Sequence, residues 1–137
     1  MKIATPLVVL MLLIGLSPER GLASVCVYKP PKVRQVHGRV VDPSNEPIPG
    51  VTVRLKQGDV TVATATTDSI GSFSFASLQD GDYYLNASIA GFHPAGYVVI
   101  LRHQTRRWKQ SLRVKLAIGI DQCAGSIEVV KPAELSR

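Results

Sequence analysis

The 137-residue chain is poor in cysteine, tryptophan and acidic residues: it has two cysteines, one tryptophan, and 10 aspartates and glutamates against 16 lysines and arginines. It contains no CxxC motif and no cysteine–histidine spacing of the zinc type, which argues against a zinc centre or a dithiol redox site. It also lacks the GxSxG, HExxH and P-loop motifs, so nothing indicates the hydrolases, metalloproteases and nucleotide-binding proteins that carry them. Downstream of the N-terminal segment it has no hydrophobic run of the about 20 residues needed to cross a membrane.

The first 23 residues have the organisation of a secretory signal peptide. Lys2 supplies a positive n-region, residues 7–16 form an apolar stretch, and residues 21–23 (Gly-Leu-Ala) form a small-x-small end. Because this stretch is shorter than the about 20 residues of a membrane-spanning helix, we expect cleavage after Ala23, with a retained membrane anchor as the alternative. A lipoprotein signal is disfavoured, since Val25 precedes Cys26. The mature chain is therefore expected in the periplasm or cell envelope, or outside the cell, with no transmembrane segment.

Removal of residues 1–23 leaves 114 residues with 14 lysines and arginines and 9 acidic residues, a net charge of +5. This density is below that of nucleic-acid-binding arms, and an exported chain is not expected to bind nucleic acid. Acidic residues and asparagine share loops at residues 42–46 and 80–82. Side chains of this kind commonly bond to their own backbone in turns, so we expect neither a metal site nor a cofactor.

The two cysteines, Cys26 and Cys123, lie near the two ends of the mature chain. An even number of cysteines in an exported protein favours an intramolecular disulfide, with free thiols or an intermolecular link as the alternatives. Closing a loop of nearly a hundred residues would stabilise the fold by about 4.7 kcal/mol in the chain-entropy model.

From residue 36 onward, apolar and polar residues alternate with a period of two, and no segment has convincing helical periodicity. The pattern predicts an all-β, seven- to eight-stranded antiparallel β-sandwich. We expect residues 24–35 to form an extended N-terminal lead-in, residues 36–117 the sandwich, and residues 118–137 a C-terminal tail tied by Cys123 to Cys26. The expected strands are residues 36–41, 51–55, 60–67, 73–75, 83–89, 97–101 and 112–116, with a further short strand at 127–130.

The turns between these strands carry the chain's rigid and flexible residues. Pro43, Pro47 and Pro49 stiffen the first connection, and Gly50 can adopt whatever backbone angle the next strand requires. The runs VHGRVVDPSNEPIPGVTVRL and ATTDSIGSFSFASLQDGDYYLNASIAGF together resemble the carboxypeptidase regulatory-like domain family. This resemblance implies a transthyretin-like (prealbumin-like) sandwich, related to starch-binding-domain-like and Cna-B-type modules.

Members of such families have many roles, so the resemblance implies a fold more strongly than a function. The same fold hosts 5-hydroxyisourate hydrolase, whose site combines histidines and arginine with a Tyr-Arg-Gly-Ser-type C-terminus. This chain ends in PAELSR, which lacks that signature. The histidines His37, His93 and His103 lie in separate segments and are interpreted as surface residues. We therefore expect no enzymatic activity, with a small hydrolase of this type as a remote alternative.

The stretch LRHQTRRWKQSLRVK, residues 101–115, is the most unusual in the chain. It holds six lysines and arginines beside the only tryptophan, and no acidic residue occurs between Asp82 and Asp121. A cationic loop with an aromatic side chain suits a sugar ring, an anionic polysaccharide or an acidic protein surface. The alternative is a solvated loop whose charges prevent edge-to-edge pairing of strands. The hypothesis is a glycan-binding module of the envelope or cell surface that uses Arg102, His103, Arg106, Arg107, Trp108 and Lys109. The alternative is a protein-interaction or adhesion module that uses a strand edge or this basic loop.

Overall fold

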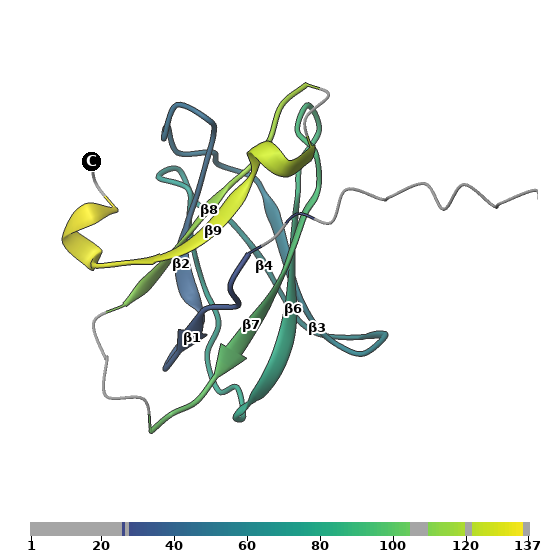
Figure 1. Ribbon diagram of the computed structural model, residues 1–137, viewed down its shortest axis with the longest axis vertical. Helices are drawn as coiled ribbons and strands as arrows, with labels where there is room; N and C mark the ends of the chain where they lie inside the picture. Colours follow the sequence, from purple (N-terminus) through teal and green to yellow (C-terminus); the bar gives the residue numbers. More distant parts are fainter. Residues whose placement is uncertain (1–25, 27, 105–109, 120–121, 136–137) are drawn as a thin grey trace, which may run out of the picture.

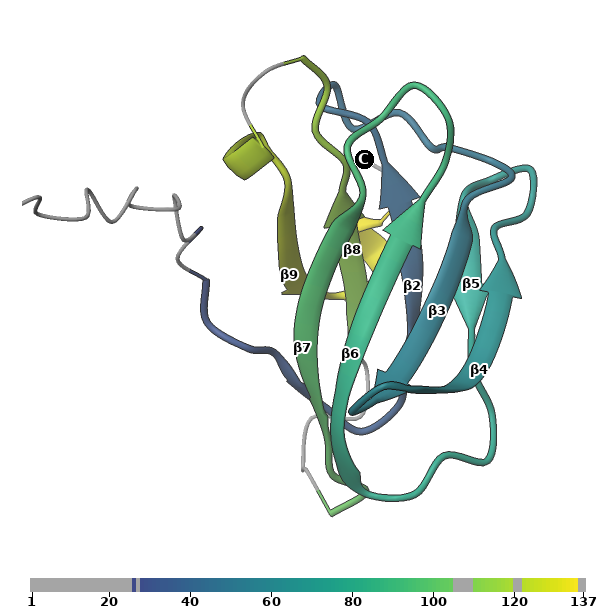
Figure 2. The same cartoon turned by 90° about the vertical axis from the view of Figure 1, so that its right-hand side faces the viewer.

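The computed structural model describes residues 26, 28–104, 110–119 and 122–135 of the chain (Figure 1). Within this part, nine strands form two sheets that pack face to face as a β-sandwich (Figure 2). Two short 3-10 turns, η1 (Gln122–Ala124) and η2 (Pro132–Glu134), are the helical elements. The strands are β1 (Lys32–Val33), β2 (His37–Val41), β3 (Thr52–Gln57), β4 (Val60–Thr66), β5 (Ser72–Ser74), β6 (Gly81–Ser88), β7 (Ala95–Leu101), β8 (Ser111–Lys115) and β9 (Ser126–Val130).

The first sheet has the strand order β1-β7-β6-β3-β4 and the second the order β5-β2-β8-β9. The expected all-β fold is confirmed, but the expectation of seven or eight antiparallel strands is wrong in two respects. The described residues form nine strands, because the lead-in adds the two-residue β1, too short to show any periodicity. Two pairings, β1 with β7 and β2 with β8, are parallel. A period of two gives the face of each side chain but not the direction of the neighbouring strand.

The core lies between the sheets and consists of the alternating apolar residues. Leu55, Leu85 and Leu112 are fully buried, together with Val53 of β3 and Val114 of β8. Each such side chain stabilises the fold by about 1.5–3 kcal/mol relative to an exposed position. The opposite faces of β3 and β6 carry polar or charged side chains such as Arg54 and Asn86. The observed alternation therefore follows the sequence pattern closely along these strands.

The proline-rich β2–β3 connection is fixed by a buried threonine. The hydroxyl of Thr67 accepts a hydrogen bond from the Val51 amide at 2.8 Å and donates one to the Ile48 carbonyl at 2.8 Å. Gly50 has a φ of 76° at the entrance to β3, a conformation that glycine adopts without strain. The rigid connection thus directs the chain from the second sheet to the first.

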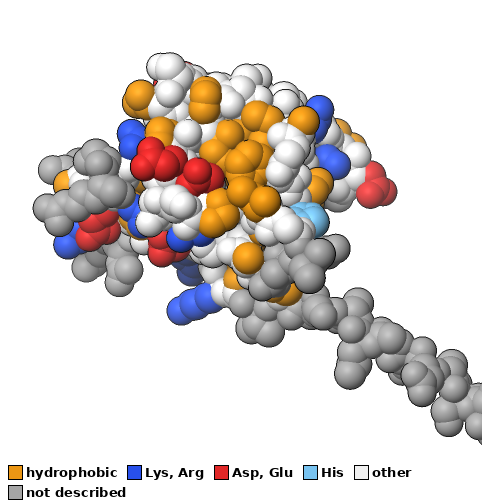
Figure 3. All heavy atoms as spheres, turned by 90° about the horizontal axis from the view of Figure 1, so that it is seen from above, with side chains coloured by type: hydrophobic (Ala, Val, Ile, Leu, Met, Phe, Trp, Pro, Cys, Tyr) orange, Lys and Arg blue, Asp and Glu red, His pale blue; other side chains and the backbone are white. Residues whose placement is uncertain are grey.

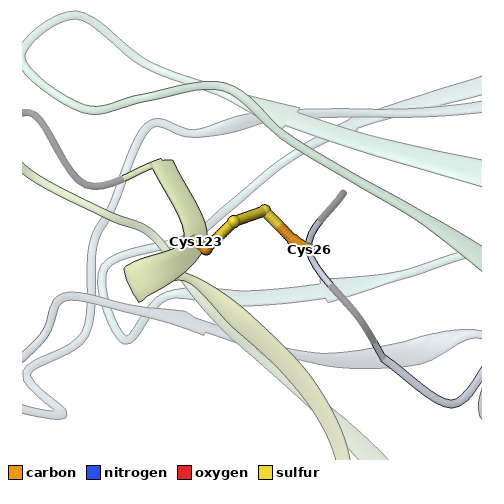
Figure 4. The surroundings of a disulfide bond; sticks show 2 residues. All are labelled: Cys26 and Cys123. Atoms are coloured by element: carbon orange, nitrogen blue, oxygen red, sulfur yellow. A yellow bond between two sulfur atoms is a disulfide. The ribbon is translucent and has the colours of Figure 1, made fainter. Parts of the chain in front are cut away.

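The N-terminal lead-in runs along β7 and is held at several points. Cys26 forms the expected disulfide with Cys123 in η1, with the two Cα atoms 5.3 Å apart (Figure 4). The Tyr28 hydroxyl accepts a hydrogen bond from the Val98 amide at 2.7 Å. The Pro31 carbonyl accepts one from Ile100 at 2.9 Å. These bonds hold the proline-containing lead-in against the sandwich.

The described ranges contain no helix that is long and apolar enough to span a membrane. The proposed signal peptide, residues 1–23, lies outside the described residues, so its export role stays a prediction.

Candidate binding site

A cleft of about 430 Å³ opens at the end of the sandwich where β2, β6 and β8 begin and β5 and β7 end. We call it the histidine cleft. Three connections meet there: the β1–β2 link, the β5–β6 loop and the start of the β7–β8 loop. Its walls combine apolar residues, among them Val36, Phe75 and Leu101, with a polar set. The polar lining residues are Arg34, Gln35, His37, Ser77, His103 and Gln110.

Two buried polar atoms of this cleft have no hydrogen-bond partner in the described part of the chain. They are Nδ1 of His37 and Oε1 of Gln110. The other ring nitrogen of His37, Nε2, lies 3.0 Å from the hydroxyl of the buried Ser111. A buried polar atom without a partner costs about 1–3 kcal/mol, so a ligand that supplies hydrogen bonds to both atoms would recover this cost. The cleft is thus suited to a hydroxyl-rich ligand.

Two side-chain contacts connect the start of the β7–β8 loop to the residues around the start of β6. His103 contacts Asp80 through both its backbone amide (2.9 Å) and its ring Nδ1. Arg102 forms an ion pair with Asp82 at 3.3 Å. The hydrogen bond from the His103 amide is the main cause that lowers the pKa of Asp80, and the His103 ring and Arg102 act in the same direction. Asp80 and Asp82 are therefore both engaged by side chains from the start of the β7–β8 loop.

The sequence-predicted binding residues divide into two groups. His103 lines the histidine cleft, and Arg102, which precedes it in the chain, pairs with Asp82. Arg106, Arg107, Trp108 and Lys109 lie outside the described residues. Gln110, which directly follows that segment, and His103 both line the cleft.

The acidic loops considered for metal binding act as turns. Asp42 accepts hydrogen bonds from the amides of Ser44 and Glu46 at 2.8 and 2.9 Å, as expected for a residue that caps its own loop. Across the residues that the structure describes, no group of three or more histidine, cysteine or acidic side chains could hold a metal ion.

Arg34 and Gln110 were not recognised as site residues from the sequence, and His37 was interpreted as a surface histidine. The structure places all three in one cleft, although they come from segments some 75 residues apart in the chain. The available signals were weak. His37 opens a strand that is otherwise apolar on one face, and Gln110 directly follows the basic segment.

The opposite end of the sandwich has different chemistry. Figure 3 looks down on that end and shows a hydrophobic patch with acidic side chains beside it. The connections there carry the half-buried Ile89 and Phe92, the exposed Ile118, and the acids Asp42 and Glu46. The end opposite the histidine cleft therefore presents apolar side chains to solvent, with acidic side chains beside them.

The two facing sheets define the chain as a transthyretin-like β-sandwich module with a polar cleft at one end. A family model for the carboxypeptidase regulatory-like domain matches residues 35–115, and the chain belongs to this family, as the sequence resemblance implied. The solved structure of 5-hydroxyisourate hydrolase from Klebsiella pneumoniae is similar, with a TM-score of 0.52 and 24% sequence identity over 71% of this chain and 99% of the hydrolase chain. No curated protein sequence matches the chain.

Proposed function

We propose that this protein is an exported, non-enzymatic module that binds an anionic glycan at the cell envelope or outside the cell. The observation that carries the proposal is the histidine cleft, which combines cationic Arg34, unpartnered polar atoms and apolar walls. Sugars present hydroxyl groups to polar atoms and C–H faces to apolar or aromatic side chains. Trp108 and the neighbouring basic residues, which follow His103 in the sequence, would supply the aromatic face and further charge.

Export is supported by the composition of the first 23 residues and by the disulfide between Cys26 and Cys123. Disulfides form and persist mainly in oxidising compartments. The proposal accordingly requires no cofactor and no metal ion.

Binding of a uronic-acid oligosaccharide to the disulfide-bonded mature protein, measured by titration calorimetry, tests this function. We expect Arg34→Gln and Trp108→Ala each to weaken binding by at least about tenfold, or about 1.4 kcal/mol. Lys115→Gln is the matched control, since it removes one positive charge at the far end of β8, away from the cleft. Equal affinity of the wild type and Trp108→Ala, or an equal loss for Lys115→Gln, would contradict a specific site.

The second candidate is a protein-interaction module, and the outer strand β4 favours it. β4 pairs only with β3, carries no charged residue, and leaves Val60 and Val62 63% and 43% exposed. Such an edge can accept a strand of a partner protein. Crosslinking in the native cell would then capture a specific partner, and Thr64→Lys should abolish the capture.

A small hydrolase remains the remote alternative. The two histidines and the arginine that line one cleft favour it, and the C-terminal sequence PAELSR disfavours it. Turnover of 5-hydroxyisourate by the purified protein would support this alternative, and the absence of turnover would exclude it.

A further inference from the structure

A second depression, of about 630 Å³, runs between the edge strands of the two sheets. We call it the edge groove. One wall is the lead-in from Lys29 to Lys32, and the other is β9 with Ile127, Glu128 and Val129. Ile100 of β7 and the apolar side chains of β9 give it a largely hydrophobic floor. Such a floor suits the C–H faces of sugar rings.

The edge groove continues into the histidine cleft. Gln110 lines both, and its buried Oε1 has no partner within the described residues. The lead-in also connects them, because Lys29 and Lys32 line the groove and Arg34 lines the cleft. A ligand that follows the lead-in therefore passes from one depression to the other.

The charge along this path is positive. Lys29, Lys32 and Arg34 are exposed, and they lie along a stretch of chain that can span at most about 18 Å and bends at Arg34. The acid that lines the edge groove, Glu128, is already paired with Arg113 at 3.0 Å. A ligand with one negative charge per repeat would meet several cations in a row, and a single sugar would reach only one end.

The lead-in is held in place before any ligand arrives. The disulfide fixes Cys26, the Tyr28 ring packs edge-on against Tyr97 with centroids 5.1 Å apart, and the Val33 carbonyl accepts a bond from the Arg102 amide at 2.9 Å. Burial, together with the nearby Tyr28 and Tyr84, raises the pKa of Tyr97, so the phenol under the lead-in adds no negative charge. A wall that is already ordered loses little conformational entropy on binding.

We propose that the edge groove and the histidine cleft form one continuous path for a linear, carboxylated polysaccharide, with the basic lead-in as its wall. The inference deepens the proposed glycan-binding function and rests on it. The carboxylates face Lys29, Lys32 and Arg34, and sugar hydroxyls donate to Oε1 of Gln110. Polyanionic peptides are the competing class of ligand, and the test separates the two.

The experiment titrates the disulfide-bonded mature protein with a dimer, a tetramer and a hexamer of one uronic acid, and with polyglutamate of matched length. We expect affinity for the wild type to rise at least about tenfold from dimer to hexamer. In the double variant Lys29→Gln, Lys32→Gln this gain should disappear while the dimer binds as before, because the cleft is unchanged. Lys115→Gln, the control for net charge, should keep the full gain.

Amide chemical shifts give a second reading that does not depend on any variant. The hexamer should shift the amides of Ile100 and Val129, which line the edge groove, and the dimer should leave them unmoved. Affinity independent of length, or a gain retained in the double lysine variant, overturns the continuous path but leaves glycan binding in the cleft standing. Polyglutamate binding as tightly as the hexamer overturns the carbohydrate class. Failure of every uronate to bind removes the proposed function itself.

Discussion

Removal of the Cys26–Cys123 bond gives the strongest prediction about stability. The bond joins residues 97 positions apart, so it constrains nearly the whole folded part of the chain. In the chain-entropy model a closed loop of about 100 residues contributes about 4.7 kcal/mol, chiefly by restricting the unfolded state. The lead-in keeps its contacts through Tyr28 and Pro31 without the bond, so little native structure is lost with it. We therefore expect the double variant Cys26→Ser, Cys123→Ser to fold, but to be less stable by about 4 kcal/mol.

Thermal and urea unfolding, followed by circular dichroism, measure this effect. At about 5 °C per kcal/mol for a domain of this size, the melting temperature should fall by about 20 °C. The open chain of the variant also unfolds to a more expanded state, which exposes more surface. The urea m-value should therefore be larger in the variant than in the oxidised wild type.

The control is a reducing agent, which should move the wild type towards the variant and leave the variant unchanged. Melting temperatures that agree within about 2 °C for the oxidised wild type and the variant would refute the reasoning, because the closed loop would then contribute nothing. A lower stability with an unchanged m-value would instead indicate that loss of the bond destabilises the folded state rather than expanding the unfolded state. That result would contradict the claim that the lead-in holds its place without the bond.

Two further predictions concern the frame of the histidine cleft. An added methyl at Gly38 would lie 1.9 Å from the backbone oxygen of Leu112 in the paired strand β8. Gly38→Ala should therefore lower the free energy of unfolding by about 3 kcal/mol in an unfolding titration. Gly96→Ala is the comparison: its methyl would meet only the end of the partly exposed Tyr84 side chain, so it should cost under half as much. The pKa of Asp80 is lowered, chiefly by the His103 amide, so its stabilisation is present above the ordinary carboxyl pKa of 3.8 and lost as the pH falls further. Wild type should melt higher than Asp80→Asn at pH 7, and the two curves should converge below pH 3.8; a constant difference would contradict this sign.

The fold could be predicted from the sequence because its information is local. The alternation of apolar and polar residues predicts the strands, and the prolines and glycines predict the connections between them. The even number of cysteines predicts one disulfide. Phe73 and Leu85 are buried and their neighbours Ser72 and Asn86 are not, because successive side chains of a strand point to opposite faces. The two parallel pairings could not be predicted, because direction depends on how distant strands meet. β1 escaped notice because it has only two residues, directly after two prolines.

The site could be predicted only in part. A run of positive charge beside a tryptophan is visible in the sequence, and His103 of that run lines the cleft. The role of Arg34 and His37 depends on the parallel pairing of β2 with β8, which brings His37 next to Ser111. The sequence periodicity does not show that residues about 75 positions apart lie close together. The edge groove was missed for the same reason, since its walls come from the two ends of the domain.

The topology also explains why the polar residues of the histidine cleft gather at one end of the sandwich. Strands β2, β6 and β8 begin at this end, and β5 and β7 end there. The β1–β2, β5–β6 and β7–β8 connections therefore meet around one cleft. The prolines and the Thr67 hydroxyl occupy the other end and fix its connections. Asp80 and Asp82 at the cleft end contact His103 and Arg102, respectively. The exposed Lys29 and Lys32 of the lead-in add positive charge near the same end. An anionic partner is favoured by this imbalance, whatever the identity of its repeating unit.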